Sequence, residues 1–260
     1  MTVQTIDDVV SALDTIVQQS YDSASRLGYF AALYRRVTTA VRDGLSSGSF
    51  SNGPLMETLD VVFASRYLDA LATFQAGGTP TRSWILAFRG CGDADLLILQ
   101  QLLSGMNAHI NLDLGIAAAQ TCPGDQLPQL QPDFDEINAV LSEQVAAVEA
   151  EMAAVSPLIG DLEKIGLRTE TSIINFSLQA ARDNAWFNAQ RLAGEPSALH
   201  DVTIDGLDLA VSIEGGAILH PPVGAEGLKI IQQAEVKDVR RVIEVLWQSG
   251  TATTQAAGAS

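Results

Sequence analysis

Apolar side chains recur at every third or fourth position along most of the chain, a spacing that is typical of amphipathic α-helices. This periodicity predicts helices over residues 6–16, 27–41, 54–70, 133–152, 169–192 and 236–246. Local signals mark two of their starts. Pro54 stands where a first helical turn tolerates proline, and Asp133 with Glu136 three residues later matches an N-terminal capping pattern. The fold is therefore expected to be all-α.

The longest apolar segment runs from Asp93 to about Gln120 and contains no proline. Its apolar residues cover nearly the whole circumference of a helix, as expected where a helix packs against neighbours on several sides. We therefore expect this segment to be the central, buried helix of a multi-helix bundle.

A segment in the last third of the chain fits two structures. Leu209, Val211 and Ile213 alternate with other residues before a Gly-Gly pair, which suits a hairpin. Leu207 and Val211 are also one helical turn apart, and we favour the helix. The fold of residues 200–225 stays open at this point.

The domain organisation follows from what the chain lacks. No internal repeat, low-complexity linker or charge block divides it, so we expect a single α-helical domain over residues 1–250. Residues 251–260 contain no large apolar group and are expected to form a disordered tail. The alternative of two domains would place the break between Pro123 and Pro132.

Composition and charge exclude several classes of protein. Hydrophobic residues make up 47% of the chain and charged residues 18%, as in folded globular proteins. The net charge of −16 repels polyanions and anionic lipid headgroups, so we expect neither nucleic acid nor a membrane surface as a partner. No run of residues resembles the stretch of about 20 apolar residues that a membrane-spanning helix needs.

The N-terminal segment and the cysteines indicate a cytoplasmic protein. Asp7, Asp8 and Asp14 lie where a secretory signal peptide would be uncharged. Cys91 and Cys122 are the only cysteines, and neither belongs to a Cys-x-x-Cys pair, which fits reduced thiols better than a disulfide scaffold.

Four polar side chains lie close together inside the predicted central helix. His109 and Asp113 are four residues apart and share one helical face, while Asn107 and Asn111 line a neighbouring face. Burial of such groups costs free energy unless each finds a hydrogen-bond partner. In one interpretation, Asp113 orients His109 as a general acid or base. In the other, all four groups belong to a structural network between helices.

A metal site has less support. His-x-x-x-Asp can supply two ligands from one helical face, but the chain has only three histidines: His109, His200 and His220. The Glu-x-x-His pairs of di-iron bundles are absent, which leaves a carboxylate-rich site of Asp60, Asp69 or Asp113 as the alternative. No phosphate-binding loop or nucleophile elbow is present. We therefore predict neither a metal nor a cofactor.

Two further predicted helices carry polar groups within reach of a ligand. In the helix at 27–41, Tyr29 and Arg36 share one side with Arg26, and Tyr34 lies on the apolar stripe with a hydroxyl that needs a partner. In the next helix, Arg66 and Asp69 are three residues apart and can pair.

Structural pairing is the commoner role for such arginines, although a guanidinium group can also clamp an anionic ligand. Later in the chain, Arg182 and Trp186 are expected to stack on one helix face as part of the packing between helices.

Three stretches together resemble a known family. They are SRLGYFAALYRRVT (25–38), FASRYLDA (63–70) and MNAHINLDLG (106–115). They resemble domain-of-unknown-function family 5995, whose members are mostly bacterial, and a weaker likeness continues through Asp133-Phe134 and Ala181-Arg182 to Trp186. The likeness covers roughly residues 21–192.

This resemblance implies a helical protein and brings no established activity. It also implies that five residues belong to the shared core of the family: His109, Asn111, Asp113, Arg66 and Tyr67.

The leading hypothesis is a cytoplasmic small-molecule enzyme that performs metal-free acid/base chemistry on a largely apolar substrate in an interhelical pocket, as a cyclase, isomerase or lyase does. His109 would move the proton and Asp113 would orient His109. The remaining candidates would bind the substrate: Asn107, Asn111, Tyr29, Tyr67, Arg66 and Arg36.

Three alternatives are a non-catalytic binder of a lipophilic ligand, a protein-interaction module with a structural polar network, and a metal-dependent hydrolase. A cavity that touches His109 would favour an enzyme or a binder. A fully packed and hydrogen-bonded His109 and Asp113 would favour the interaction module. The sequence leaves the substrate and the oligomeric state undetermined.

Overall fold

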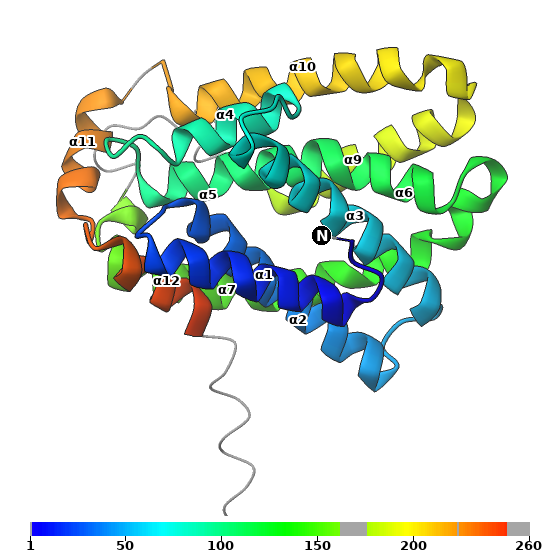
Figure 1. Ribbon diagram of the computed structural model, residues 1–260, viewed down its shortest axis with the longest axis horizontal. Coiled ribbons are helices and arrows are strands. Elements are labelled where there is room, and N and C mark those ends of the chain that lie inside the picture. The colour runs from blue at the N-terminus through cyan, green and yellow to red at the C-terminus, as the bar shows by residue number, and fades with distance from the viewer. Residues whose placement is uncertain (1, 162–175, 223, 249–260) are drawn as a thin grey trace, which may run out of the picture.

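The computed structural model describes residues 2–161, 176–222 and 224–248, and these residues form helices without any β-strand (Figure 1). The first half contains α1 (Ile6–Asp22), α2 (Leu27–Ser47), α3 (Gly53–Gln75), α4 (Arg82–Gly90), α5 (Ile98–Met106), the π-helix η1 (Asn107–Leu114) and α6 (Gly115–Thr121). The second half contains α7 (Gln131–Val155), α9 (Leu178–Gly194), α10 (His200–Leu219), α11 (Ala225–Ala234) and α12 (Val239–Gln248). Short 3₁₀ segments connect them at Gly124–Gln129, Ile159–Asp161 and Ser197–Leu199. The all-α prediction is confirmed.

The predicted central helix is confirmed, although it is not a regular α-helix. α5, η1 and α6 follow one another without a break, because Met106, Asn107, Leu114 and Gly115 all keep right-handed helical backbone angles. The segment η1 contacts α3, α4, α9 and α10, and each of its residues except Ile110 is buried. Figure 1 shows this helix between α10 on one side and α1, α2 and α12 on the other. The bundle is therefore built around it.

The central helix begins later than the sequence pattern predicts, at Ile98 instead of Asp93. Its first N–H groups are fixed from outside the helix. Both carboxylate oxygens of Glu235 accept a hydrogen bond from the N–H of Ile98, at 3.2 Å each. A residue far away in the sequence thus determines where this helix starts.

The predicted capping role of Asp133 is wrong. Helix α7 already begins at Gln131, so Asp133 lies inside its first turn. Its buried carboxylate instead accepts the backbone N–H groups of Ser51 and Asn52 at 2.6 and 2.7 Å. Asp133 therefore anchors the loop that leads into α3 and does not cap its own helix α7.

Helix α4 is capped in the same way by a distant carboxylate. Asp208 of α10 is buried and accepts the backbone N–H groups of Arg82 and Ser83 at 2.8 and 3.0 Å. Neither α4 nor α11 is anticipated from the sequence. Both are short, at 9 and 10 residues, and α4 depends on this contact with α10 for its first turn.

The open segment 200–225 is resolved in favour of a helix, since α10 extends without interruption from His200 to Leu219. The last predicted helix starts at Val239, later than expected, because the N–H of Val236 bonds to the carbonyl of Val155 at 2.8 Å. Residues 169–175 of one predicted helix, and the predicted tail 251–260, lie outside the described residues.

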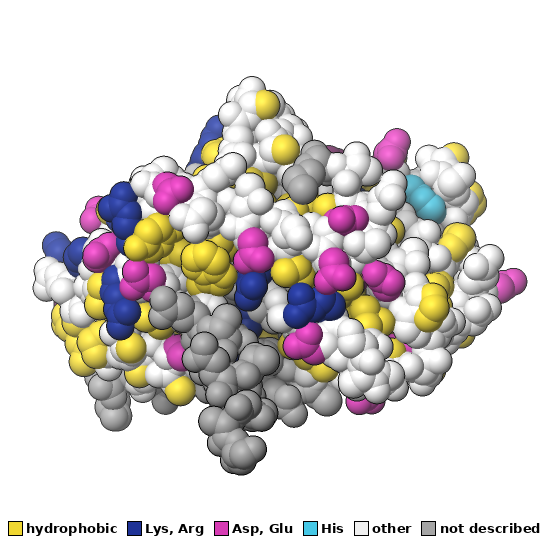
Figure 2. Space-filling model, turned by 60° about the horizontal axis from the view of Figure 1, so that its bottom comes forward, with side chains coloured by type: hydrophobic (Ala, Val, Ile, Leu, Met, Phe, Trp, Pro, Cys, Tyr) yellow, Lys and Arg dark blue, Asp and Glu magenta, His cyan; other side chains and the backbone are white. Residues whose placement is uncertain are grey.

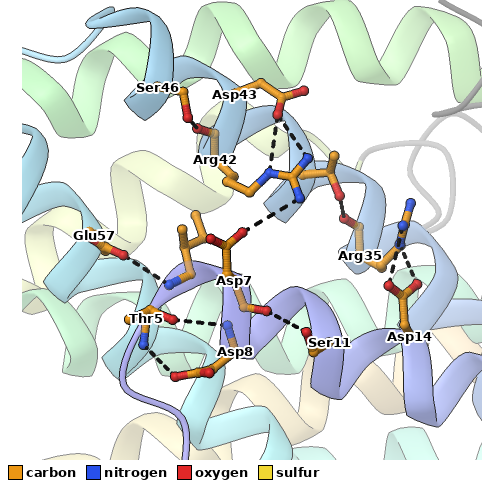
Figure 3. A network of polar contacts seen from close by, with 12 residues as sticks. Thr5, Asp7, Asp8, Ser11, Asp14, Arg35, Arg42, Asp43, Ser46 and Glu57 are labelled. Atoms are coloured by element: carbon orange, nitrogen blue, oxygen red, sulfur yellow. Dashed lines mark hydrogen bonds and ion pairs between the residues drawn. The ribbon is translucent and has the colours of Figure 1, made fainter. Parts of the chain in front are cut away.

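Polar contacts fix α1 against α2 and α3 (Figure 3). Thr5 and Asp8 form a capping box at the start of α1, and the N–H of Ile6 donates to Glu57 of α3 at 3.1 Å. Arg35 of α2 pairs with Asp14 of α1 at 2.7 Å. A partly exposed pair of this kind contributes about 1 kcal/mol at most, so it orients α1 more than it stabilises it.

The surface agrees with the acidic composition. On the face shown in Figure 2, Lys and Arg side chains lie among Asp, Glu and hydrophobic side chains and form no continuous basic area. Within the described residues, every helix is too short or too polar to cross a lipid bilayer.

Replacement of Asp208 tests the role of these distant caps. Asp208→Ala is expected to lower the free energy of unfolding by about 2–3 kcal/mol, because buried N–H groups at the start of α4 lose their acceptor. Asp201→Ala, an exposed change on the same helix, should stay within about 0.5 kcal/mol of the wild type. Urea unfolding followed by circular dichroism measures both. Equal midpoints for the two variants would contradict this role.

Candidate functional site

His109 lies at the centre of the molecule inside a cage of aromatic rings. Its imidazole ring stacks on Phe63 of α3, with ring centroids 3.6 Å apart and planes 9° apart. Tyr34 and Phe30 of α2 approach its edges at 4.4 and 5.6 Å, and Trp84 of α4 lies 6.0 Å away. Only 3% of His109 is exposed to solvent. Three helices thus supply the walls around one polar ring.

Neither ring nitrogen of His109 has a hydrogen-bond partner. Nδ1 lies 3.9 Å from Oδ2 of Asp113, beyond the 2.7–3.2 Å of a hydrogen bond. Burial lowers the pKa of His109, and the nearby charge of Asp113 opposes that shift only in part. The imidazole is therefore neutral near pH 7, with nitrogen lone-pair capacity that the protein does not use.

Asp113 is held by other residues. It is 1% exposed and accepts a hydrogen bond from Nε of Arg66 and from Nε1 of Trp84, each at 2.7 Å. Arg66 therefore pairs with Asp113 of the central helix instead of Asp69, the partner that the sequence suggests. Asp113 does not orient His109 through a hydrogen bond, because its two carboxylate oxygens accept from Arg66 of α3 and Trp84 of α4. It acts on His109 only as a negative charge 3.9 Å from Nδ1.

The two asparagines connect η1 to α10. Asn111 donates from Nδ2 to Oδ1 of Asn107 at 2.9 Å, and Asn107 donates from Nδ2 to the carbonyl of Val211 at 2.9 Å. Both side chains are buried. Their amide groups thus form a structural network, as one of the two interpretations of the sequence proposed.

The structure does not bring Tyr29 and Arg36 to His109. Tyr29 packs with residues of α7 and α12, and burial raises the pKa of its hydroxyl to about 12. Arg36 binds Gln144 and Glu151 of α7 at 2.6 and 2.7 Å. The prediction failed because α2 turns a different side toward α3 and η1.

The side of α2 that faces the site carries Phe30 and Tyr34. Tyr34 is the tyrosine that sequence reasoning did not select, although its position on the apolar stripe, with a hydroxyl in need of a partner, was the available signal. Tyr67 does reach the cage, with its ring 6.2 Å from that of His109. Of the predicted substrate-binding residues outside η1, Tyr67 therefore contacts the cage, and Arg66 contacts Asp113 beside it.

The predicted stack of Arg182 on Trp186 also differs in the structure. The guanidinium of Arg182 lies 4.4 Å from the ring centroid of Phe134 and donates to the carbonyl of that residue. The ring of Trp186 also packs against Phe134, with ring centroids 4.8 Å apart. The packing role expected for this pair holds, with Phe134 between them as the shared contact.

A very small cavity lies beside the rings that surround His109. This cavity is about 10 Å³, enough for about one water molecule. Its walls include Phe30, Tyr67 and Trp84, and these three rings also surround His109. Helices α2 and α3, which carry Tyr29 and Arg66, do wall His109, with closely packed rings beside a very small cavity, and a substrate-sized pocket stays a prediction.

Three more buried oxygen atoms near this cage lack a partner. They are the hydroxyl of Tyr34, Oγ1 of Thr38 and Oδ2 of Asp60. Burial, followed by the charge of Asp60, raises the pKa of Tyr34 well above its usual value. Burial also raises the pKa of Asp60 to about 7, with the charge of Glu57 as a smaller cause. The unsatisfied oxygens of this region therefore belong to two hydroxyl groups and to a carboxyl group that holds its proton up to about pH 7.

Other chemistry has less support from the geometry. Within residues 2–161, 176–222 and 224–248, no three His, Cys, Asp or Glu side chains gather closely enough to hold a metal ion. Burial raises the pKa of the Cys91 thiol to about 12, so this cysteine is a poor nucleophile at neutral pH.

The chain belongs to a family of unknown function, DUF5995, whose family model matches residues 6–221. This match confirms the resemblance seen in the sequence and extends it to nearly the whole of α1 through α10. No curated protein and no solved structure matches the chain significantly. Membership in the family brings no activity, and the argument for a function rests on the site itself.

The neutral state of His109 predicts a dependence of stability on pH. Because burial holds its pKa below the ordinary 6.5, the unfolded chain binds the proton more readily than the folded one. Stability from this group is complete above pH 6.5 and is lost below it by up to about 1.4 kcal/mol per pH unit. We expect the difference in unfolding free energy between wild type and His109→Phe to change with this slope, whereas His220→Gln, at an exposed position, leaves the slope unchanged.

A second prediction separates the two possible partners of Arg66. Arg66→Ala should lower the free energy of unfolding by about 3 kcal/mol, because the buried carboxylate of Asp113 loses its cation. In the Asp113→Asn background the same change should cost clearly less. Asp69→Ala, at an exposed position on the same helix, should have almost no effect. Denaturant unfolding of the four variants gives these energies, and equal costs of Arg66→Ala in both backgrounds would show that the pair contributes nothing.

Proposed function

We propose that this DUF5995 protein is a cytoplasmic small-molecule enzyme in which His109 acts as a general base in metal-free acid/base chemistry on a largely apolar substrate. The observation that carries the proposal is that both nitrogens of a 97% buried imidazole lack a partner. An unsatisfied buried polar atom costs about 1–3 kcal/mol, and a purely structural network would avoid this cost. A neutral imidazole with a free nitrogen is the form that a general base requires.

The backbone around His109 supports the same conclusion. The segment η1 keeps π-helical hydrogen bonds over eight residues. Such segments are rare, and they occur frequently at functional sites. All the polar side chains of the predicted cluster lie on this segment.

The neighbours of His109 suit a proton acceptor. The carboxylate of Asp113, 3.9 Å from Nδ1, stabilises the imidazolium that forms when His109 takes up a proton. Arg66 and Trp84 fix Asp113, so this negative charge keeps its place during the reaction. The aromatic walls favour an apolar substrate and exclude water from the base.

Entry of a substrate requires the cage to open. The present cavity of about 10 Å³ admits no more than a water molecule. Because Phe30, Tyr67 and Trp84 line this cavity and also surround His109, movement of these rings would extend the cavity to His109. Opening of this kind, with closure over the bound substrate, is common in enzymes that exclude water from the reaction.

A second candidate is a non-catalytic helical module, either a binder of a lipophilic ligand or a protein-interaction domain. The observation that favours it is the close packing of the site: Phe63 stacks on His109 at 3.6 Å, and Asp113 has both of its oxygens bonded. The free nitrogens of His109 are the feature that this alternative leaves without a role.

Exchange of carbon-bound hydrogen tests the proposal without knowledge of the natural substrate. Apolar ketones, with cyclohexanone as the simplest probe, lose their α-hydrogens to deuterium oxide when a base acts on them, and proton NMR follows the loss. We expect the protein to accelerate the exchange of at least one ketone of a size series, and His109→Gln to slow it at least 100-fold.

The matched control is His220→Gln, which removes an exposed histidine and should retain the wild-type rate. Rates equal to buffer across the series, or equal rates for His109→Gln and the wild type, would contradict the proposal. In that case the non-catalytic module would be the better description of the protein.

A further inference from the structure

Asp60 is an unusual carboxyl group. It lies on α3, is 5% exposed, and its Oδ2 has no hydrogen-bond partner. No ion pair of the described residues includes it, and the charge that acts on it most comes from Glu57, which has the same sign. A buried carboxylate without a cation or a donor is too costly to remain charged. Asp60 is therefore a carboxyl group that stays mostly protonated in the folded protein up to about pH 7.

Its position relates it to His109. Asp60 precedes Phe63 by one turn of α3, and Phe63 stacks directly on the imidazole. On the facing helix α2, Tyr34 contacts His109 and is also affected by the charge of Asp60. Thr38, one turn after Tyr34, adds a third unpartnered oxygen. The base thus lies on η1 and the carboxyl group on α3, and the unpartnered oxygens of Tyr34 and Thr38 lie on the facing helix α2.

We infer that Asp60 is the general acid that works with His109, so that the site catalyses the movement of a proton between two positions of one substrate, as in an isomerisation. This inference rests on the proposed function of His109. A free nitrogen of His109 takes a proton from a substrate carbon, and the electron pair of that bond shifts within the substrate. The carboxyl group of Asp60 gives its proton to the atom that receives this electron pair.

The sum of these two transfers is balanced. The substrate loses one proton and gains another, the imidazole becomes an imidazolium ion, and the carboxylic acid becomes a carboxylate. Return of the proton from His109 to Asp60, through the hydroxyl of Tyr34 or through solvent when the cage opens, restores both groups. No oxidant, reductant or further reactant is required.

The electrostatics of the two groups agree with these roles. Burial lowers the pKa of His109 and raises that of Asp60 to about 7, so the base is unprotonated and the acid is protonated at the same pH. Opposite shifts of this kind in two groups of one site are the pattern from which acid and base assignments are made.

Other charged groups around Asp60 already have partners. Glu57 accepts the N–H of Ile6, and Asp7 and Asp14 of α1 pair with Arg42 and Arg35 of α2 (Figure 3). From η1, Asp113 pairs with Arg66. The segment of α6 that packs on α3, GIAAAQT, contains no ionisable side chain. The proton that is followed in the two experiments below therefore belongs to Asp60.

The protonation state can be measured without a substrate. Infrared difference spectra of wild type and Asp60→Asn at neutral pH should contain the carbonyl band of a protonated carboxyl group, with its shift in deuterium oxide. Asp69→Asn, an exposed change on the same helix, should leave the band in place. Absence of the band in the wild type would overturn the inference, whatever the role of His109.

Stability gives an independent measure of the same proton. The folded chain holds the proton of Asp60 up to about pH 7, and the unfolded chain releases it near pH 3.8. The unfolding equilibrium constant of wild type, relative to Asp60→Asn, should therefore rise about 300-fold between pH 4 and pH 7. A ratio that stays constant over this range would overturn the inference.

The catalytic role requires a separate result. Asp60→Asn should reduce the exchange of the ketone probe at least 10-fold and remove the loss of rate on the alkaline side of the pH profile, and Asp60→Glu should restore part of both. An unchanged rate and pH profile in Asp60→Asn, with the His109→Gln rate still reduced, would refute the role of Asp60 and leave the proposed function of His109 intact. Loss of the His109 effect itself would refute the proposed function.

Discussion

The structure depends on the burial of one negative charge at its centre. The carboxylate of Asp113 is nearly inaccessible to water, and it is stable there because Arg66 and Trp84 each donate a hydrogen bond to it. These three residues come from η1, α3 and α4, so satisfying the charge brings the three elements together. The same contacts place Phe63 and Trp84 around His109 and thereby form its aromatic cage.

Buried carboxylates serve the same purpose at the periphery. Asp133, Asp208 and Glu235 each accept backbone N–H groups from a segment far away in the sequence, and they fix where α3, α4 and α5 are anchored. Each of these three buried carboxylates thus has backbone donors. Several other buried atoms also lack a partner, but among them only His109 leaves both polar atoms of its side chain unsatisfied, and this is the physical basis for assigning function to it.

The sequence led to part of the site. Four polar residues inside an apolar helix are visible in any reading of the chain, and their burial on the central helix follows from its apolar circumference. The sequence was a poorer guide to the side chains that surround His109. Helix α2 presents Tyr34 to His109 and turns Tyr29 and Arg36 toward α7 and α12. Asp60 was considered only as a metal ligand, because its lack of a cation is a property of the packed structure.

Helical periodicity and the apolar central segment by themselves determined the all-α fold, because side-chain spacing along a helix is a local property of the chain. Contacts between distant residues decided the rest. The start of α5 depends on Glu235, the presence of α4 on Asp208, and the partner of Arg66 on how α3 packs against η1. The closed cage around His109 likewise exists only once three helices have packed, since the free energy of a buried polar group depends on partners that the local sequence does not specify.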